Sequence, residues 1–596
     1  MIERVRPLRR RMVLPTLTVA AVVVAGCSSG PDQPDTVAGQ FAEALEAGDA
    51  QTAADLTTDP AAAAAVIGGL FEGLGSDSPD VTLGGTGDGD TFELDVVWRL
   101  GPDADAAGDS GEWSYRTAGS AVDGDAGWRI RWDPAVLAPG LTADTSLRYV
   151  RTQGVPASVL DRSGQPLMEQ RVVTLVNLDA TADPAAVAPV LATVVPSITA
   201  ESLAADLAAA GSGPVTALTL RDEDLAPVEA RLLALPGVSL VAQTRLLTVD
   251  RALASPVWSG LAERWQDGQD AAAGWAVQSV ESDGPARRVA GVDGSDAPDV
   301  RTTIDLGLQA RAEAAVAPVS QPAVVVAVEP STGAVRAVAQ NAAADAEGPV
   351  ALTGLYPPGS TFKTVTTWAA LQAGVADPDT VLPCPGVATI EDRTIPNDDS
   401  FDLGAVPLHT AFARSCNTTM ARLAVGLPAD ALTDAAAQFG LGIDYVTPGL
   451  VTVTGSVPVT ESAAQRVESA IGQGTVTASP FGMAMVAASI VRGSPPLPMI
   501  VQSEPATADR TVDAASETTT AALRTMMRET VTDGTATALR DIPELIGKTG
   551  TAEYGDNSGA HGWFIAAQND LAFAVFVAGA GSSAPAVEVA GRMLRG

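Results

Sequence analysis

The sequence predicts a multidomain chain of the mixed α+β and α/β class. Its 596 residues exceed one ordinary domain, and an apolar fraction of 46% is enough for several buried cores. Residues 91–100, TFELDVVWRL, alternate apolar and polar side chains, as a half-buried antiparallel strand does. Residues 323–577 hold strand-like runs on both sides of a long stretch of apolar helices. This order predicts a sheet covered by helices.

The first region, residues 31–145, is predicted to be a small α+β domain. Val37, Phe41 and Leu45 lie four residues apart and Gly48 follows, which predicts an amphipathic helix with a glycine stop. Residues 127–132, GWRIRW, alternate like a strand, and turn-rich stretches separate the strands. No cluster of chemically active side chains occurs here.

Two further regions follow, at residues 146–305 and 306–596. The first mixes strand and alanine-rich helix patterns and is predicted to be a spacer or pairing domain. The second opens with a predicted helix, TTIDLGLQARAEAAV, and continues with two β-rich runs joined by PSTG, a hairpin signal. LAFAVFVAGA near the end is predicted to be a buried strand. We expect a sandwich of sheet and helices.

The N-terminus is predicted to be a signal peptide over residues 1–26. Five arginines precede an apolar run from Met12 to Ala25, shorter than the roughly 20 residues that span a bilayer. Val24, Ala25 and Gly26 come before Cys27, an order that resembles a bacterial lipobox and implies lipidation of Cys27. The alternative is an uncleaved membrane anchor. Either way, we expect the bulk of the chain outside the cytoplasm.

Charge and residue counts exclude several classes of site. A net charge of −35 disfavours nucleic-acid binding, which needs clustered cations. The only histidines are His409 and His561, and no HExxH pair exists, so we expect no metal and no cofactor. Cys384 and Cys416 remain after Cys27. They either form a disulfide or stay as two buried thiols.

Lysine is rare, and its first position suggests catalysis. The chain has 34 arginines and two lysines, and Lys363 lies in YPPGSTFKTV, three residues after Ser360. The PPGS sequence predicts a helix start with Ser360 as a candidate cap, which makes the two side chains neighbours. A serine nucleophile needs a base, and lysine can lose a proton where arginine cannot. The alternative is an ordinary cap followed by a helix cation.

The second lysine, Lys548, lies in LIGKTGTAEYG. Strand alternation puts Thr549 and Thr551 on one face, where their hydroxyls could bind a carboxylate, and Gly550 lets a ligand approach the backbone. The same alternation sends Lys548 to the opposite face. Its entry into a shared site therefore requires strand twist or side-chain reach.

A third fragment, HTAFARSCNTTM, contributes Ser415 and Asn417 after a short helical pattern. The three motifs SxxK, SxN and KTG occur in this order, separated by about 50 and about 130 residues. Together they form the signature of the active-serine, penicillin-recognising enzymes, which is far more specific than any one of them.

From about residue 310, the chain resembles the transpeptidase domain of penicillin-binding proteins. IGQGTVTASPFGMAM and GWFIAA belong to this resemblance. Upstream, LDRSGQPL resembles the start of the pedestal, or dimerisation, domain of monofunctional class B members, and RIRWDPAVLAPGL resembles the end of an NTF2-like extension. With its lipobox, the chain resembles the actinobacterial penicillin-binding lipoproteins, which implies a lipid-anchored protein on the extracytoplasmic face of the cell membrane.

The resemblance implies a role for each motif residue. Ser360 would be the acylated nucleophile and Lys363 its base. Ser415 would relay a proton, Asn417 would hold the substrate amide, and Lys548 would supply positive potential. Thr549, Gly550 and Thr551 would bind the terminal carboxylate, and the backbone N–H groups of Ser360 and Thr551 would form the oxyanion hole.

The implied reaction is D,D-transpeptidation of peptidoglycan stem peptides ending in D-Ala-D-Ala, with β-lactams acylating the same serine. Cell-division or elongation proteins are expected partners. The alternatives are a D,D-carboxypeptidase, a β-lactamase, a β-lactam sensor, or a scaffold that only binds wall precursors. A spacer of nearly 300 residues before the catalytic region favours an enzyme that stands off the membrane to reach wall strands.

Overall fold

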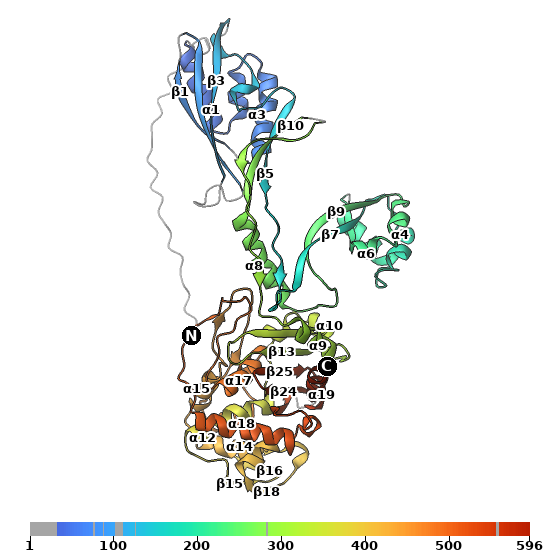
Figure 1. The fold of residues 1–596 in the computed structure, drawn as a ribbon, viewed down its shortest axis with the longest axis vertical. Coiled ribbons are helices and arrows are strands. Elements are labelled where there is room, and N and C mark those ends of the chain that lie inside the picture. Colours follow the sequence, from blue (N-terminus) through green and yellow to red (C-terminus); the bar gives the residue numbers. More distant parts are fainter. Residues whose placement is uncertain are drawn as a thin grey trace. The chain divides into compact units, whose positions relative to one another are not determined.

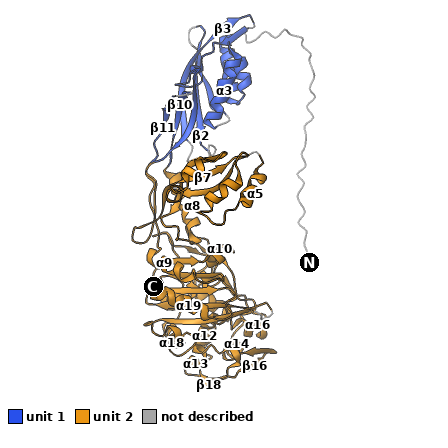
Figure 2. Cartoon of the chain, turned by 90° about the vertical axis from the view of Figure 1, so that its right-hand side faces the viewer, with its two compact units in different colours: residues 1–153, 273–295 blue, residues 154–272, 296–596 orange. Residues whose placement is uncertain are grey.

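The structure is a computed structural model. It describes residues 33–75, 78–86, 89–101, 111–125, 127–211, 213–281, 284–555 and 559–596. The predicted signal peptide and Cys27 lie outside these ranges. The chain forms two compact units, one of residues 1–153 with 273–295 and one of residues 154–272 with 296–596 (Figure 2). Among the described helices, none combines the length and the apolar character that crossing a bilayer requires.

The first unit packs three helices and two antiparallel sheets around one apolar core. Its elements are α1 (Pro34–Glu46), α2 (Ala50–Asp55), α3 (Pro60–Leu74), β1 (Asp80–Thr86), β2 (Thr91–Leu100), β3 (Gly111–Gly124), β4 (Gly127–Ile130), the 3-10 turn η1 (Pro134–Val136), β5 (Thr145–Thr152), β10 (Gly274–Glu281) and β11 (Arg287–Val292). Val37, Phe41 and Leu45 of α1 are buried, and β2 buries every second residue, which confirms both predicted elements. Strands β10 and β11 return from the region predicted as the spacer; β10 pairs with β5, and β11 pairs with the other edge of β10.

The first part of the second unit is a sheet in which the long strand β7 pairs with β6, β8 and β9. Its elements are β6 (Val159–Leu160), β7 (Pro166–Leu178), α4 (Pro184–Leu191), α5 (Ala200–Ala210), β8 (Val215–Arg221), α6 (Asp222–Leu225), α7 (Glu229–Leu233), β9 (Val238–Thr248), α8 (Val257–Ala272) and β12 (Val300–Arg301). The turn between β6 and β7 is closed by the buried Asp161, which accepts backbone hydrogen bonds from Ser163 and Gln165.

The C-terminal part is built on a five-stranded antiparallel sheet in the order β14-β13-β25-β24-β23. Figure 1 labels three neighbouring strands of this sheet, β13, β25 and β24. The strands are β13 (Ala323–Val328), β14 (Val335–Gln340), β23 (Ile546–Tyr554), β24 (Gly559–Gln568) and β25 (Leu571–Val577). Helices α9 (Leu306–Val316) and α19 (Ala584–Arg595) share a core with one face, and α17 (Pro480–Arg492) shares a core with the other. Every residue of β13 is buried, and the predicted hairpin and the buried strand β25 are confirmed.

Helices and small strands surround this sheet. They are α10 (Ala342–Asp345), α11 (Val350–Thr353), η2 (Gly359–Phe362), α12 (Lys363–Gln372), β15 (Val381–Cys384), β16 (Val387–Ile390), β17 (Arg393–Pro396), η3 (Asp398–Ser400), β18 (Gly404–Pro407), α13 (Leu408–Ala413), α14 (Asn417–Val425), α15 (Ala431–Gln438), β19 (Tyr445–Val446), β20 (Gly455–Ser456), α16 (Ala463–Ser469), β21 (Thr477–Ala478), β22 (Thr507–Ala508), α18 (Glu517–Thr532) and η4 (Thr537–Leu539). Strand β23 is an edge strand, and its outer side contacts α18 and η2.

The helix start at PPGS differs from the predicted one. The 3-10 turn η2 precedes α12, and no side chain caps either element. The prediction that Ser360 acts as a helix cap is therefore wrong. Since Ser360 lies inside η2 instead of ahead of the helix, its hydroxyl is not used on the backbone.

Candidate active site

Ser360 lies where the 3-10 turn η2 approaches the edge strand β23. Gly359 has a φ of +53°, and a Cβ on it would lie 2.4 Å from the carbonyl oxygen of Thr551. Only glycine allows this conformation and this contact at low cost. Ser360 itself is half-buried, and its hydroxyl makes no hydrogen bond to any described residue. The turn thus presents an unengaged hydroxyl next to the strand.

Lys363 is fully buried one helical turn after Ser360. Its Nζ donates to three oxygens of the SxN motif: Ser415 O at 2.6 Å, Ser415 Oγ at 3.1 Å and Asn417 Oδ1 at 2.6 Å. These bonds join the first two predicted motifs. All hydrogen-bond acceptors of the amine among the described residues are neutral.

Lys548 reaches the same hydroxyl from the other side. Its Nζ donates to Ser415 Oγ at 3.0 Å and to Thr549 O at 3.0 Å, and it lies 5.7 Å from the ring centre of Phe412. Alternation put Lys548 on the face opposite Thr549 and Thr551, so its entry into the site required strand twist or side-chain reach. The contact with Ser415 shows that its amine does reach the site. The three motifs therefore meet at one point, the hydroxyl of Ser415.

Burial changes the protonation of both lysines. It lowers the pKa of Lys363 well below the usual lysine value; the charge of Lys548 lowers this pKa further, and Asp398 opposes the change. Burial also lowers the pKa of Lys548 to about 7. An amine with a depressed pKa has a neutral fraction that can accept a proton. Lys363 can therefore serve as a base at this site.

Ser415 has a strained backbone. Its φ is +62°, a left-handed conformation that non-glycine residues adopt at a cost of about 1 kcal/mol. The residue follows α13, and its N–H donates to Phe412 O at 2.9 Å. This conformation places both its carbonyl and its hydroxyl on Lys363.

The middle residue of the SxN motif is covalently tied. Cys384 and Cys416 form a disulfide with a Cα–Cα distance of 6.1 Å, and both are fully buried. The sequence left the state of these cysteines open. The bond connects strand β15 to the residue between Ser415 and Asn417, so it restrains the segment that binds Lys363.

The KTG threonines lie in different surroundings. Thr549 is buried, and its hydroxyl lies 2.5 Å from the hydroxyl of Thr535. Thr551 is half-buried on β23. A Cβ on Gly550 would lie 2.9 Å from Thr361 Cγ2 and 3.0 Å from Pro358 O, so glycine allows β23 to pack against η2. Thr535 was not found from the sequence, because TDGTA carries no motif.

The two histidines take part in other contacts. The Nδ1 atom of His409 lies 2.7 Å from Glu529 Oε2, and His561 stacks on Tyr554 with ring centres 4.3 Å apart. Burial lowers the pKa of His561. Within the described residues, neither imidazole makes a hydrogen bond to Ser360 or Ser415. This arrangement is not a serine–histidine pair.

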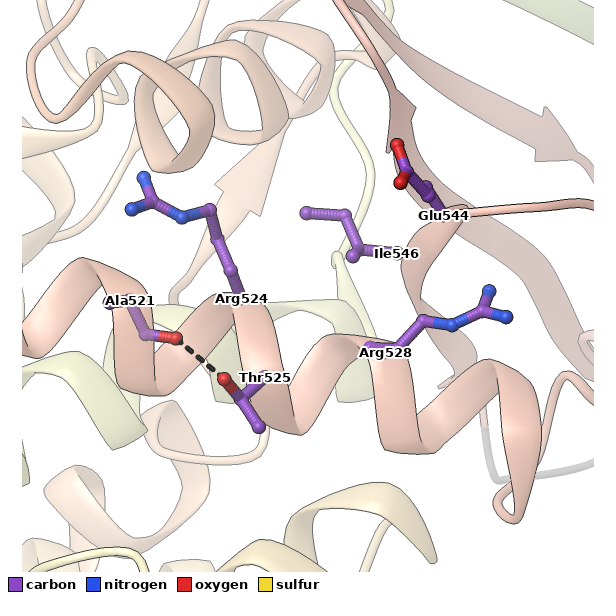
Figure 3. A pocket seen from close by; sticks show the side chains of 6 residues that line it. All are labelled: Ala521, Arg524, Thr525, Arg528, Glu544 and Ile546. Atoms are coloured by element: carbon purple, nitrogen blue, oxygen red, sulfur yellow. Dashed lines mark hydrogen bonds between the residues drawn. The ribbon is translucent and has the colours of Figure 1, made fainter.

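A separate groove of about 540 Å³ lies between α18 and the start of β23 (Figure 3). It is lined by Ala521, Arg524, Thr525, Arg528, Glu544 and Ile546. Arg524 donates to Val491 O at 3.1 Å and Arg528 to Leu545 O at 2.7 Å, so both guanidinium groups are used on backbone carbonyls. None of the motif side chains lines this groove.

Comparison with known proteins agrees with the geometry. Residues 323–595 match the penicillin binding protein transpeptidase domain, and residues 33–145 match the NTF2-like N-terminal transpeptidase domain. Two solved chains share the fold. One, from "Structural coordination of polymerization and crosslinking by a peptidoglycan synthase complex", has a TM-score of 0.56 and 22% identity and covers 76% of this chain and 91% of its own. The other, from "Complex between Penicillin-Binding Protein (PBP2) and MreC from Helicobacter pylori", has a TM-score of 0.57 and 16% identity and covers 75% of this chain and 98% of its own.

Curated relatives are peptidoglycan D,D-transpeptidases. PbpA of Mycobacterium tuberculosis is 33% identical over 242 residues, which are 36% of this chain and 48% of PbpA. PbpA of Mycolicibacterium smegmatis is 35% identical over 239 residues, with the same coverage. MrdA of Acinetobacter baumannii is 24% identical over 324 residues, which are 46% of this chain and 48% of MrdA. The chain spans about half the length of the curated relatives it matches. The two domain matches and these relatives support a class B penicillin-binding protein with an NTF2-like N-terminal domain.

Proposed function

We propose that this protein is a monofunctional serine D,D-transpeptidase that cross-links peptidoglycan stem peptides through an acyl-enzyme on Ser360. One observation carries the proposal: a fully buried lysine of depressed pKa lies one turn from a free serine hydroxyl and is hydrogen-bonded to both side chains of the SxN motif. The names of the curated relatives support the same activity.

In the first step, neutral Lys363 takes the proton of the Ser360 hydroxyl. The oxygen attacks the carbonyl carbon of the D-Ala-D-Ala bond and forms a C–O bond, while the carbonyl oxygen becomes an oxyanion. The backbone N–H groups of Ser360 and Thr551 stabilise that charge. The close approach of Gly359 to Thr551 supports this pairing, because it brings the two backbones together.

Breakdown of the tetrahedral intermediate releases D-alanine. The C–N bond breaks and the leaving nitrogen takes a proton from the Ser415 hydroxyl, which is replenished by the proton that Lys363 took from Ser360, since Lys363 donates to this hydroxyl. Asn417 holds the amide side of the peptide. Lys548 supplies positive potential for the terminal carboxylate.

The carboxylate site is formed by Thr549, Gly550 and Thr551. Hydroxyl donors suit a carboxylate, and Gly550 between them lets β23 pack against η2. Thr535 orients the Thr549 hydroxyl through their 2.5 Å contact. A β-lactam carries an equivalent carboxylate and would acylate Ser360 in the same way.

In the second step, an amino group of a neighbouring strand attacks the ester carbonyl. A new amide bond forms, the ester bond to Ser360 breaks, and the proton of the amine returns through Lys363 to the serine oxygen. Water in place of the amine would make the protein a D,D-carboxypeptidase, or a β-lactamase or β-lactam sensor when the ester comes from a β-lactam. A wall-precursor-binding scaffold would not form the ester.

Location and partners extend the proposal. The signal peptide and Cys27 predict a lipid-anchored protein on the extracytoplasmic face of the cell membrane, where peptidoglycan is assembled. Cell-division or elongation proteins are the proposed partners. One solved relative of this fold is a complex of PBP2 with MreC, which supports a partner of that kind.

A fluorescent penicillin tests the proposal. The wild-type protein should become covalently labelled and Ser360→Ala should not, while Ser320→Ala, an exposed serine of the same domain, should label normally. A stem-peptide substrate with an added amino acceptor then separates transfer from hydrolysis. Hydrolysis alone in the presence of the acceptor would exclude the transpeptidase. Label on Ser360→Ala would show that the nucleophile is a different residue.

A further inference from the structure

Asn397 directly follows β17, and its side chain is only 3% exposed. Its Oδ1 accepts hydrogen bonds from the backbone N–H groups of Asn417 at 2.8 Å and Thr418 at 3.2 Å. Its Nδ2 donates to Pro385 O and Phe401 O, each at 2.9 Å. These four bonds all go to backbone groups.

The two bonds to Oδ1 supply an acceptor for backbone N–H groups at the start of α14. The first N–H groups of a helix have no partner inside the helix. The N-cap residue, Cys416, makes no side-chain cap bond, so Asn397 supplies the missing acceptor from a separate loop. The capped residue is Asn417, whose Oδ1 accepts the 2.6 Å hydrogen bond from Lys363. One asparagine thus fixes the backbone of a second asparagine that holds the lysine.

The same side chain also contacts the disulfide. The Nδ2 atom of Asn397 lies 3.4 Å from Cys384 Sγ. Its bonds to Pro385 O and Phe401 O hold both ends of the segment 385–401, in which Asn397 lies. The same side chain thereby links this segment to the SxN motif. The disulfide restrains Cys416 covalently, and Asn397 restrains the next two residues by hydrogen bonds.

We propose that Asn397 is a positioning residue for acylation: it orients Asn417, and through it the Lys363 amine, for proton transfer from Ser360. The inference rests on the proposed function of the site. If it holds, loss of the side chain lowers the first-order rate of acylation more than it weakens penicillin binding, since the carboxylate site on β23 is untouched. A displacement of about 1 Å in such a group lowers a rate by roughly 100-fold.

A matched control exists in the same domain. Asn341 is 7% exposed and also makes four backbone hydrogen bonds. Its Oδ1 accepts from Ala323 N and Ala344 N, each at 3.1 Å, and its Nδ2 donates to Val319 O at 2.7 Å and Gln321 O at 2.8 Å. Asn341 makes no hydrogen bond to a motif residue within the described chain. Its loss imposes the same kind of structural damage without moving the site.

The experiment measures acylation by a penicillin at several concentrations in the full chain, which gives a dissociation constant and a rate constant. Asn397→Ala should lower the rate constant roughly 10- to 100-fold and change the dissociation constant less than threefold. Asn341→Ala should lower the unfolding temperature with a rate constant within threefold of wild type. Equal losses of rate in the two variants, or a wild-type rate in Asn397→Ala, would overturn the positioning role.

Asn397→Asp keeps the inference testable if the alanine variant does not fold. It keeps the acceptor for Asn417 and Thr418 and loses the two donors. The added charge joins Asp398 in raising the pKa of Lys363, so the acylation profile should move to higher pH. The lost bonds to Pro385 and Phe401 should loosen the acceptor's position and lower the maximal rate. An unchanged rate and profile would overturn the proposal. Wild type and Ser360→Ala belong in the same series, because failure of their labelling pattern refutes the proposed function rather than this inference.

Discussion

Lys363 donates a 2.6 Å hydrogen bond to Oδ1 of Asn417, a residue 54 positions further along the chain. This contact joins the SxxK motif to the SxN motif, with the lysine fully buried and the asparagine half-buried. Because the acceptor is an amide, the bond orients the amine without holding its proton. A base at this position has to be both oriented and able to lose a proton.

Lys363→Arg should fold and lose acylation by roughly 10²- to 10⁴-fold, since a guanidinium keeps the charge but cannot act as a base. Thermal unfolding checks the fold, and the penicillin acylation rate checks the chemistry. Lys548→Arg is the comparison, because its proposed role requires charge rather than proton transfer. Losses of equal size in the two variants would argue that Lys363 also acts only as a cation.

The pH dependence of the reaction should reflect both lysines. Below the depressed pKa of Lys363 the base is protonated, so the acylation rate constant should fall as the pH falls. Lys548 loses its charge as the pH rises through about 7, so affinity for the carboxylate of penicillin should weaken above that value. Separate pH profiles of rate and affinity measure the two effects. Lys548→Met should abolish the loss of affinity at high pH, and persistence of that loss would contradict the assignment.

Two substitutions of Ser415 should slow acylation alike and differ in stability. Ser415→Gly and Ser415→Ala both remove the hydroxyl that the two lysines share, so both should acylate more slowly. Glycine tolerates the φ of +62° better, so Ser415→Gly should be about 1 kcal/mol more stable than Ser415→Ala. Denaturant unfolding of the two variants measures the difference. An alanine variant at least as stable as the glycine variant would refute the strained conformation.

The disulfide should stabilise the domain that carries the site. Closing a loop with a sequence separation of 32 contributes about 3 to 4 kcal/mol in the chain-entropy model. Reductant should therefore lower the unfolding temperature of the wild type and slow its acylation. The double variant Cys384→Ala with Cys416→Ala should resemble the reduced protein and not respond to reductant. An unfolding temperature that is the same with and without reductant would argue against a stabilising role.

The residues that bear the chemistry were predictable from the sequence because the chemistry restricts the residue type. Lys363 stands out in a chain that otherwise uses arginine, and its motif has a fixed spacing to Ser360. The alternating strands and the hairpin were predictable for a similar reason, since a period of two fixes which side chains are buried. Local patterns therefore predicted the candidate nucleophile and much of the sheet.

The remaining features depend on tertiary structure. Alternation alone could not settle whether Lys548 enters the site, because a period of two does not include side-chain reach; in the folded chain its Nζ lies 3.0 Å from Ser415 Oγ. Ser360 was predicted as a cap, but a 3-10 turn holds it instead. Asn397 lies in a loop without a motif, and its partners meet it only in the folded domain. Spacing alone also could not choose between a Cys384–Cys416 disulfide and two thiols.

The most direct test is mass spectrometry of the protein after reaction with penicillin. The account predicts one covalent adduct on the intact wild-type protein, mapped to the peptide that carries Ser360, and none on Ser360→Ala. It also predicts that Lys363→Arg accumulates this adduct far more slowly at the same concentration. An adduct on any other residue, or its formation at the wild-type rate in Lys363→Arg, would contradict the central claim that a buried lysine activates this serine.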